Sequence, residues 1–323
     1  MKPGDFRASI VITSYNQKHY LIEAIESVIN QTVRVHEIII ADDHSTDGSV
    51  ELIQDYIARY PGWIKAVFQR ENVGIPKNRN AALRQVLGDY VAILDGDDRF
   101  LPYKLERELE ALQKHLQARC VYSNVRLINS EGQPTGVRYQ KNQPSGDVFA
   151  YVARGMFGLP RSMLMDYALL REIGFMDEGF PKYDGFDLTL RLAKRCQFVY
   201  VPEPLVEYRV HSASDSKGLE ARDHLHDLEA IYEKMLPWLS DLPVVETEEI
   251  VKTWYLRLLR FRVRDALERG NRFKAYWMIL LEMVKGQVSL QDWRQMLTLV
   301  VPISSLETIK SLRSQLRVGG KIT

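Results

Sequence analysis

The feature that most constrains the fold is the regular alternation, over residues 9–95, of short β-branched runs with amphipathic segments. The runs are "SIVITSY" (9–15), "HEIIIADD" (36–43), "WIKAVFQ" (63–69) and "DYVAILD" (89–95). Such runs are typical of strands buried in a parallel sheet. Between the first three runs, aliphatic residues recur at helical spacing, at positions 21, 25, 28 and 29 and at positions 50, 53 and 57. This βαβαβ order predicts an α/β fold with a doubly wound, mostly parallel sheet.

Each of these runs is followed by polar residues. The four segments are "TSYN", "DDHSTDGS", "RENVGIPKNRN" and "DGDDR". Asp, Asn, Ser and Gly are ordinary turn residues, so one such loop alone indicates no site. The carboxyl ends of parallel strands meet at one edge of a sheet, and four polar loops at that edge predict a ligand site.

The last of these loops crowds three carboxylates, Asp95, Asp97 and Asp98, into four positions after a buried run. Like charges this close repel and raise one another's pKa unless hydrogen bonds, a basic partner or a cation offset them. A divalent cation that bridges phosphate oxygens needs only one or two protein carboxylates. The cluster therefore indicates a metal-bound phosphate.

Composition excludes several classes of protein. Forty-three basic and forty-two acidic residues give a net charge of +1, so nothing global favours nucleic-acid binding. Two cysteines, Cys120 and Cys196, are too few for a disulfide framework or a Cys-based zinc site. The N-terminus lacks a signal-peptide apolar region, and "QMLTLVVPISSL" is too short to span a bilayer. We expect a cytoplasmic protein, with the inner face of the membrane as the place where it could work.

A series of motifs resembles family two glycosyltransferases, the inverting GT-A enzymes that use nucleotide-diphosphate sugars. The motifs are "SIVITSYNQKHYLIEAIESVINQT", "EIIIADDHSTDGS", "ENVGIPKNRNAAL", "ILDGDDRFLP", "GFMDEGFPKYDGFDLTLRLA" and "YRVHSAS", in order over residues 8–214. The resemblance implies a GT-A catalytic domain over 1–214, with a nucleotide-sugar half to about residue 100 and an acceptor half over 101–214. It also implies a Mn²⁺ or Mg²⁺ cofactor.

On the donor side, the resemblance implies that Thr13 and Tyr15 line the base pocket, with the Tyr15 ring as a stacking face. Asp43 matches the carboxylate that accepts the uracil imide hydrogen, and Asp42 is the less favoured substitute. In "GIPKNRN", Arg79 could pair with Asp97 or with the diphosphate. Its alternative role is a purely structural partner of the carboxylates.

For the metal, the resemblance implies that Asp97 or Asp98 binds the ion while a neighbour, Asp95 or Asp97, holds the ribose. In "YRVHSAS", Arg209 and His211 occupy alternate positions of an extended segment and face the same side. The resemblance suggests that they contact the diphosphate or the metal. A lone histidine usually does neither, so His211 depends on its place in the motif.

The base is where the sequence departs from the family. Family members usually carry Glu-Asp, then Leu and Arg, and the Asp deprotonates the acceptor hydroxyl. Here "YDGFDLTLRL" reads Asp184-Gly185. Inversion by direct displacement still needs a base opposite the leaving group, so we select Asp184. Asp187 is the alternative, although it could merely stabilise the first turn of a helix.

The sequence predicts that residues 215–323 are a helical region of different character. Eight basic residues lie between Lys252 and Lys274, and Trp238, Trp254, Trp277 and Trp293 all lie in the last third of the chain. This composition suits a surface that contacts anionic lipid or a lipid-linked acceptor, whereas a helical bundle or a homodimer contact is at least as good an interpretation.

The function predicted from the sequence is a metal-dependent inverting transfer from a UDP-sugar to a glycan, lipid-linked or protein acceptor in surface-glycan assembly. A sugar nucleotidyltransferase is less favoured because "TSYNQKHY" lacks the glycine-rich loop that such an enzyme needs after its first strand. A non-catalytic sugar-nucleotide-binding or scaffold protein is the other alternative, because Gly185 stands where the family carries its base.

Overall fold

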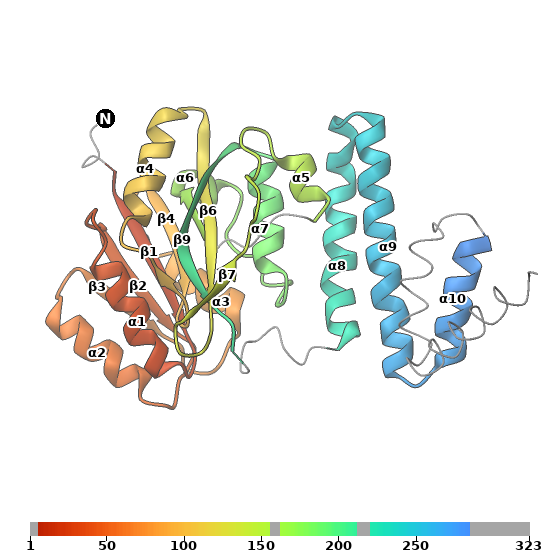
Figure 1. Ribbon diagram of the computed structural model, residues 1–323. Coiled ribbons are helices and arrows are strands. Elements are labelled where there is room, and N and C mark those ends of the chain that lie inside the picture. The colour runs from red at the N-terminus through yellow and green to blue at the C-terminus, as the bar shows by residue number, and fades with distance from the viewer. Residues whose placement is uncertain (1–5, 156–161, 212–219, 285–323) are drawn as a thin grey trace, which may run out of the picture. The chain divides into compact units, whose positions relative to one another are not determined.

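The computed structural model describes residues 6–155, 162–211 and 220–284 (Figure 1). The chain divides into two compact units, the first made of residues 1–217 with 237–242 and the second of 218–236 with 243–323. The boundary predicted at residue 214 lies outside the described residues.

The first unit is built on one curled sheet. Its strands are β1 (Ala8–Ser14), β2 (Glu37–Asp42), β3 (Ile64–Phe68), β4 (Tyr90–Asp95), β5 (Arg99–Phe100), β6 (Ala118–Ile128), β7 (Pro134–Val137), β8 (Met163–Asp166) and β9 (Gln197–Arg209). Their order is β3-β2-β1-β4-β8-β6-β9-β5, with β7 beside β6. The pairs among β1 to β4 are parallel, and so is β6 with β9, whereas β8 runs antiparallel to both of its neighbours. Strand β5 pairs antiparallel with β9, and β7 pairs antiparallel with β6. The predicted α/β fold is confirmed, in a sheet that mixes parallel and antiparallel pairs.

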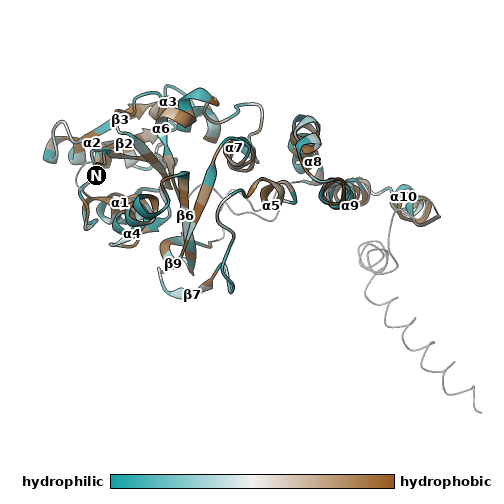
Figure 2. Ribbon diagram, turned by 90° about the horizontal axis from the view of Figure 1, so that it is seen from above, coloured by the Kyte–Doolittle hydropathy of each residue, from teal (hydrophilic) through white to brown (hydrophobic). Residues whose placement is uncertain are grey.

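Helices cover both faces of this sheet. They are α1 (Lys18–Ile29), α2 (Ser49–Arg59), α3 (Ile75–Leu83), α4 (Lys104–Lys114), α5 (Phe149–Ala153), α6 (Tyr167–Glu172) and α7 (Asp184–Ala193). In Figure 2, α1 and α4 lie on one side of the sheet and α3 and α6 on the other. Helix α1 packs because Leu21, Ala24, Ile25 and Val28 recur every three or four residues and are all buried.

The second unit is helical over its described residues. It contains α8 (Ala221–Met235), α9 (Val244–Glu268) and α10 (Arg272–Val284), and the 3₁₀ helix Leu236–Asp241 falls mostly in the first unit. Trp254 is fully buried and stacks on Tyr232 with ring centroids 5.5 Å apart. Trp254 therefore belongs to a helical core, as in the helical-bundle interpretation that the sequence left open beside a lipid-facing surface, and Trp293 lies outside the described residues.

No described helix combines the length and the apolar character that crossing a membrane requires.

Candidate active site

The parallel register gathers the polar loops at one edge of the sheet. Thr13, near the end of β1, pairs with Ala41 of β2 on one side and with Asp95 of β4 on the other. The segments that follow these three strands therefore begin side by side. Thr13, Tyr15, Asp43 and Asp95 lie at or directly after these strand ends, whereas Arg79 lies in α3 and Arg209 at the end of β9.

The loops after β1 and β2 are joined by reciprocal hydrogen bonds. Asn16 has a left-handed backbone conformation, with φ of 51°. Its Oδ1 accepts a hydrogen bond from Thr46 N at 2.8 Å, and its backbone N donates one to Ser45 Oγ at 2.9 Å. Lys18 N donates to Asp47 Oδ2 at 2.8 Å. The two loops thus form one fixed surface, from which the Tyr15 side chain stands 48% exposed. Its ring is open for stacking.

The two aspartates after β2 have different neighbours. Asp42 is buried and accepts Ser45 N at 2.8 Å and Ser45 Oγ at 2.6 Å, which caps its own loop. Asp43 accepts the backbone N of Val73 at 2.8 Å and of Gly74 at 2.9 Å. Asp43 therefore holds the β3–α3 loop in place, and its recognition of a uracil base stays a prediction.

Arg79 of α3 links the donor side to α7. Its Nη2 lies 2.6 Å from Asp95 Oδ1, and its Nη1 lies 2.7 Å from Asp184 Oδ2. Thr13 Oγ1 donates to the same Asp95 oxygen at 3.2 Å. Asp184 lies in the first turn of α7 and is buried. The series of hydrogen bonds Thr13–Asp95–Arg79–Asp184 therefore brings together four of the residues that the sequence nominates.

Asp187 is engaged elsewhere. Its Oδ2 accepts Arg191 Nε at 2.7 Å, and this arginine also donates to the backbone carbonyls of Ile173, Gly174 and Phe175. Asp187 is buried within this arrangement. Its contacts are those of a residue that stabilises the segment before α7.

The acidic loop, residues 95–98, passes closely over the end of β1. Gly96 N donates to Thr13 O at 2.8 Å, and a Cβ on Gly96 would lie 2.8 Å from that same oxygen. A side chain at position 96 would displace the loop. The glycine in "DGDD" therefore allows the carboxylates to approach the end of β1.

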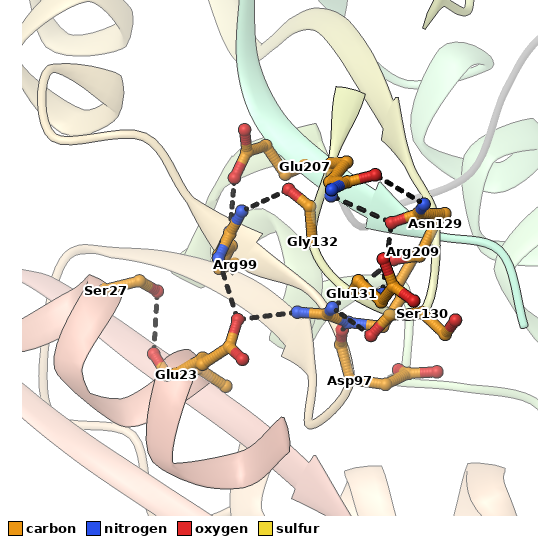
Figure 3. A network of polar contacts seen from close by, with 12 residues as sticks. Glu23, Ser27, Asp97, Arg99, Asn129, Ser130, Glu131, Gly132, Glu207 and Arg209 are labelled. Carbon is orange, nitrogen blue, oxygen red and sulfur yellow. Dashed lines mark hydrogen bonds and ion pairs between the residues drawn. The ribbon is translucent and has the colours of Figure 1, made fainter. Parts of the chain in front are cut away.

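The end of β9 supports the acidic loop. Arg209 N donates to Asp98 Oδ1 at 2.9 Å, and Arg209 Nε donates to the Asp97 carbonyl at 2.9 Å. Figure 3 shows the Arg209 side chain directed into a polar network, and it is only 1% exposed. These bonds make Arg209 a support of the loop, and its direct contact with a donor stays a prediction.

The acidic loop is in contact with His211, and the binding of a divalent cation by these residues stays a prediction. His211 Nε2 lies 2.9 Å from Asp97 Oδ2. Among the described residues, no group of three or more His, Cys, Asp or Glu side chains is placed so that it could hold a metal ion. Mg²⁺ in phosphate-transfer sites is typically held by one or two carboxylates and completed by phosphate oxygens, so an incomplete set of protein ligands fits this chemistry.

Sequence reasoning missed Tyr20, Glu23 and Arg99. The ring of Tyr20 lies 4.4 Å from the Arg209 guanidinium carbon, and Glu23 pairs with both Arg209 and Arg99. The available signal was weak. Tyr20 and Glu23 are three residues apart on α1, so they are neighbours on its surface.

Comparison with known proteins identifies a family. Residues 9–168 match the model of Glycosyl transferase family 2. A Bacillus subtilis protein named as the glycosyltransferase EpsE is 32% identical over 45% of this chain and 51% of its own length. Bacillus subtilis TuaG, named for teichuronic acid biosynthesis, is 36% identical over 39% of this chain and 49% of its own. The chain thus spans about half the length of these relatives.

A solved structure shares the fold. S. aureus TarS 1–349, crystallised in complex with UDP-GlcNAc, superimposes with a TM-score of 0.63 over 90% of this chain and 79% of that one, at 19% identity. The family match covers the sheet edge and the acidic loop described above. The chain therefore belongs to glycosyltransferase family 2 and has the GT-A fold.

Proposed function

We propose that the protein transfers a sugar, with inversion, from a nucleotide-diphosphate donor to a hydroxyl group of a glycan, lipid-linked or protein acceptor in surface-glycan assembly. The observation that carries the proposal is the series of hydrogen bonds Thr13–Asp95–Arg79–Asp184, with donor–acceptor distances of 3.2, 2.6 and 2.7 Å. It joins the acidic loop to a carboxylate on α7. Direct displacement needs both groups in one site.

The donor is proposed to be a UDP-sugar. Tyr15 offers an exposed ring at the edge of the sheet, and Asp43 lies in the adjoining loop with its carboxylate fixed by two backbone N–H groups. A carboxylate oxygen has two lone pairs, so each oxygen of Asp43 can accept a further hydrogen bond from a base. The TarS structure is a complex with UDP-GlcNAc, which supports this class of donor.

In the proposed reaction, the acceptor oxygen attacks the anomeric carbon and the bond from that carbon to the diphosphate oxygen breaks. The electron pair of that bond leaves with the nucleoside diphosphate. Asp184 receives the proton of the acceptor hydroxyl. Arg79 fixes the Asp184 carboxylate through its Oδ2. We favour Asp184 over Asp187 because the arginine that binds Asp184 also binds Asp95 of the acidic loop, whereas Asp187 pairs with Arg191 of its own helix.

The cofactor is proposed to be Mn²⁺ or Mg²⁺, held by Asp97, Asp98 and His211. When bound, the ion stabilises the negative charge of the leaving diphosphate. Asp97 and His211 already lie in contact at 2.9 Å, and Asp98 is held by Arg209 N. No three such side chains of the described residues are placed to hold the ion by themselves, so phosphate oxygens of the donor would complete its coordination.

We expect UDP to stabilise the protein only in the presence of Mn²⁺, because ligand binding to the folded state raises its free energy of unfolding by mass action. At a UDP concentration of 100 times its dissociation constant, the gain is about 2.7 kcal/mol. Thermal unfolding with UDP and Mn²⁺, and with UDP and EDTA, measures this. Asp97→Asn should abolish the Mn²⁺-dependent part. Equal stabilisation by UDP in EDTA would refute metal-assisted donor binding.

We further propose that the second unit contacts a membrane surface on the cytoplasmic side. Helix α10 exposes Phe273 by 74% and Trp277 by 49%, and Leu281 is also exposed. Arg272 and Lys274 lie in the same helix. Apolar and aromatic side chains beside basic ones suit an anionic lipid surface.

Flotation with vesicles tests this contact. We expect the protein to float with vesicles that contain anionic lipid and to lose most of this binding in Phe273→Ser/Trp277→Ser. Leu116→Ser, which alters an exposed leucine of the first unit, is the matched control. Sedimentation at several concentrations tests the alternative. A dimer that the double substitution disrupts, without any binding to vesicles, would show that this face joins two copies of the chain.

A further inference from the structure

We propose that Glu23 of α1 is a positioning residue for the acidic loop, acting on Asp97 and Asp98 through Arg209. This inference rests on the proposed function, because it assigns a role in metal-assisted donor binding. Glu23 lies outside the acidic loop and is not among the residues that the family resemblance nominates.

Glu23 and Arg209 are in direct contact. Glu23 Oε2 accepts Arg209 Nη2 at 2.7 Å, across 186 positions of sequence (Figure 3). The arginine is almost wholly buried, whereas the glutamate side chain is 41% exposed. A buried guanidinium needs a compensating anion, and Glu23 supplies a carboxylate to it.

Arg209 uses its remaining hydrogen-bond donors to hold the acidic loop and a neighbouring carbonyl. Its Nε and its backbone N bind the Asp97 carbonyl and the Asp98 carboxylate, each at 2.9 Å. Its Nη1 donates to Ser130 O at 3.0 Å. The arginine therefore fixes both the backbone and a side chain of the acidic loop. Any shift of Arg209 moves the two aspartates that the proposed cation needs.

Two residues of α1, Tyr20 and Glu23, contact Arg209. The Tyr20 ring lies under the guanidinium at 4.4 Å, one helical turn before Glu23. Tyr20 also lies beside the His211 ring, with centroids 5.3 Å apart. Helix α1 thus contacts both Arg209 and His211 with one face.

Glu23 also binds Arg99, the residue that follows the acidic loop. Its Oε2 accepts Arg99 Nη1 at 2.8 Å. Arg99 pairs in turn with Glu207 of β9 and donates to Gly132 O at 3.0 Å. Gly132 has a φ of +79°, and a Cβ there would lie 3.2 Å from Arg99 Nη2. Glu23 therefore binds both Arg99, the residue after the acidic loop, and Arg209, which binds Asp97 and Asp98.

Glu23→Gln tests the proposal, because it keeps the size of the side chain and removes its charge. Residues that orient metal ligands typically change metal affinity by roughly 10- to 100-fold when they are altered. We expect the Mn²⁺ concentration that half-saturates UDP binding, measured by calorimetry, to rise by that factor. UDP binding should recover at saturating Mn²⁺. Glu26→Gln is the matched control on the same helix, where Glu26 accepts Tyr56 OH and not Arg209.

The midpoint of the Mn²⁺ titration separates positioning from a merely structural role. A structural role would lower the melting temperature without metal and the fraction of active protein, but would leave this midpoint unchanged. Tyr20→Leu tests the same support through another side chain and should shift the midpoint in the same direction. Unchanged midpoints in folded Glu23→Gln and Tyr20→Leu would overturn the inference. A wild-type protein that binds UDP equally in EDTA would instead refute the proposed metal dependence itself.

Discussion

Replacing Asp184 by asparagine is expected to lower sugar transfer by roughly 10²- to 10⁴-fold, the usual contribution of a positioned general base. Asparagine has nearly the same shape and can still accept the hydrogen bond of Arg79 Nη1, which lies 2.7 Å from Asp184 Oδ2. It cannot take a proton from the acceptor hydroxyl. Donor binding should therefore stay near the wild-type value, and the loss should fall on the rate of the chemical step.

The measurement uses the UDP-sugar that gives the largest thermal shift and follows the release of UDP with time. Asp187→Asn is the matched control, because the same chemical change is made three residues away on α7. Asp187 is paired with Arg191, so we expect Asp187→Asn to lower the melting temperature. Full transfer by Asp184→Asn, together with lost transfer by a well-folded Asp187→Asn, would assign the base to Asp187. Unchanged transfer in both variants would show that neither carboxylate is the base, and no release by the wild type would favour a binding protein.

The second large effect is expected at a buried ion pair in α4. Lys104 and Glu108 are fully buried and pair with each other one helical turn apart. Lys104→Met leaves the Glu108 carboxylate without its cation, and breaking a buried pair in this way costs about 3–5 kcal/mol. Urea unfolding at pH 8 measures this cost. Lys104→Met/Glu108→Leu should recover most of it, because apolar replacement of a whole buried pair is often neutral.

The cost of Lys104→Met should depend on pH in a defined direction. Burial raises the pKa of Glu108 to about 7, from 4.5, even with Lys104 beside it, and burial lowers the pKa of Lys104. A carboxyl group whose pKa is raised in the folded state favours folding below its unfolded pKa, and this contribution is lost as the pH rises through the folded pKa. The variant should therefore be nearly as stable as wild type near pH 4 and much less stable at pH 8.

A surface control separates this effect from a general loss of lysine. Lys114→Met, at the exposed end of the same helix, should change stability by no more than about 0.5 kcal/mol. If Lys104→Met is as mild as Lys114→Met at pH 8, Glu108 does not need its buried partner.

The sequence by itself determined the sheet and the place of its loops. Alternating strand runs and helical faces predicted β1 to β4 and the helices α1 and α2 between the first three of them, because hydrophobic periodicity reports which face of each element is buried. Parallel strands that end in polar residues then required these loops to meet at one edge. Asp95, Asp97 and Asp98 lie at the end of β4 because they directly follow the apolar run that forms this strand.

The sequence left open whether the tryptophans of the C-terminal region face lipid or pack in a helical bundle. Trp254 has basic residues nearby, as a lipid-facing aromatic would, and it is buried against Tyr232 of α8. A tryptophan in an amphipathic helix has the same local pattern whether lipid or another helix covers it. Only the partner helix decides between the two.

Only the tertiary structure decided which charged groups meet. Arg79 pairs with Asp184 across 105 positions, and Arg209 pairs with Glu23 across 186. No periodicity encodes such a pair, because ion pairing requires only that two elements pack with the right faces together. The choice between Asp184 and Asp187 illustrates the reason. Both are carboxylates in the first turn of α7, and they differ in what lies opposite them, Arg79 of α3 for Asp184 and Arg191 of the same helix for Asp187.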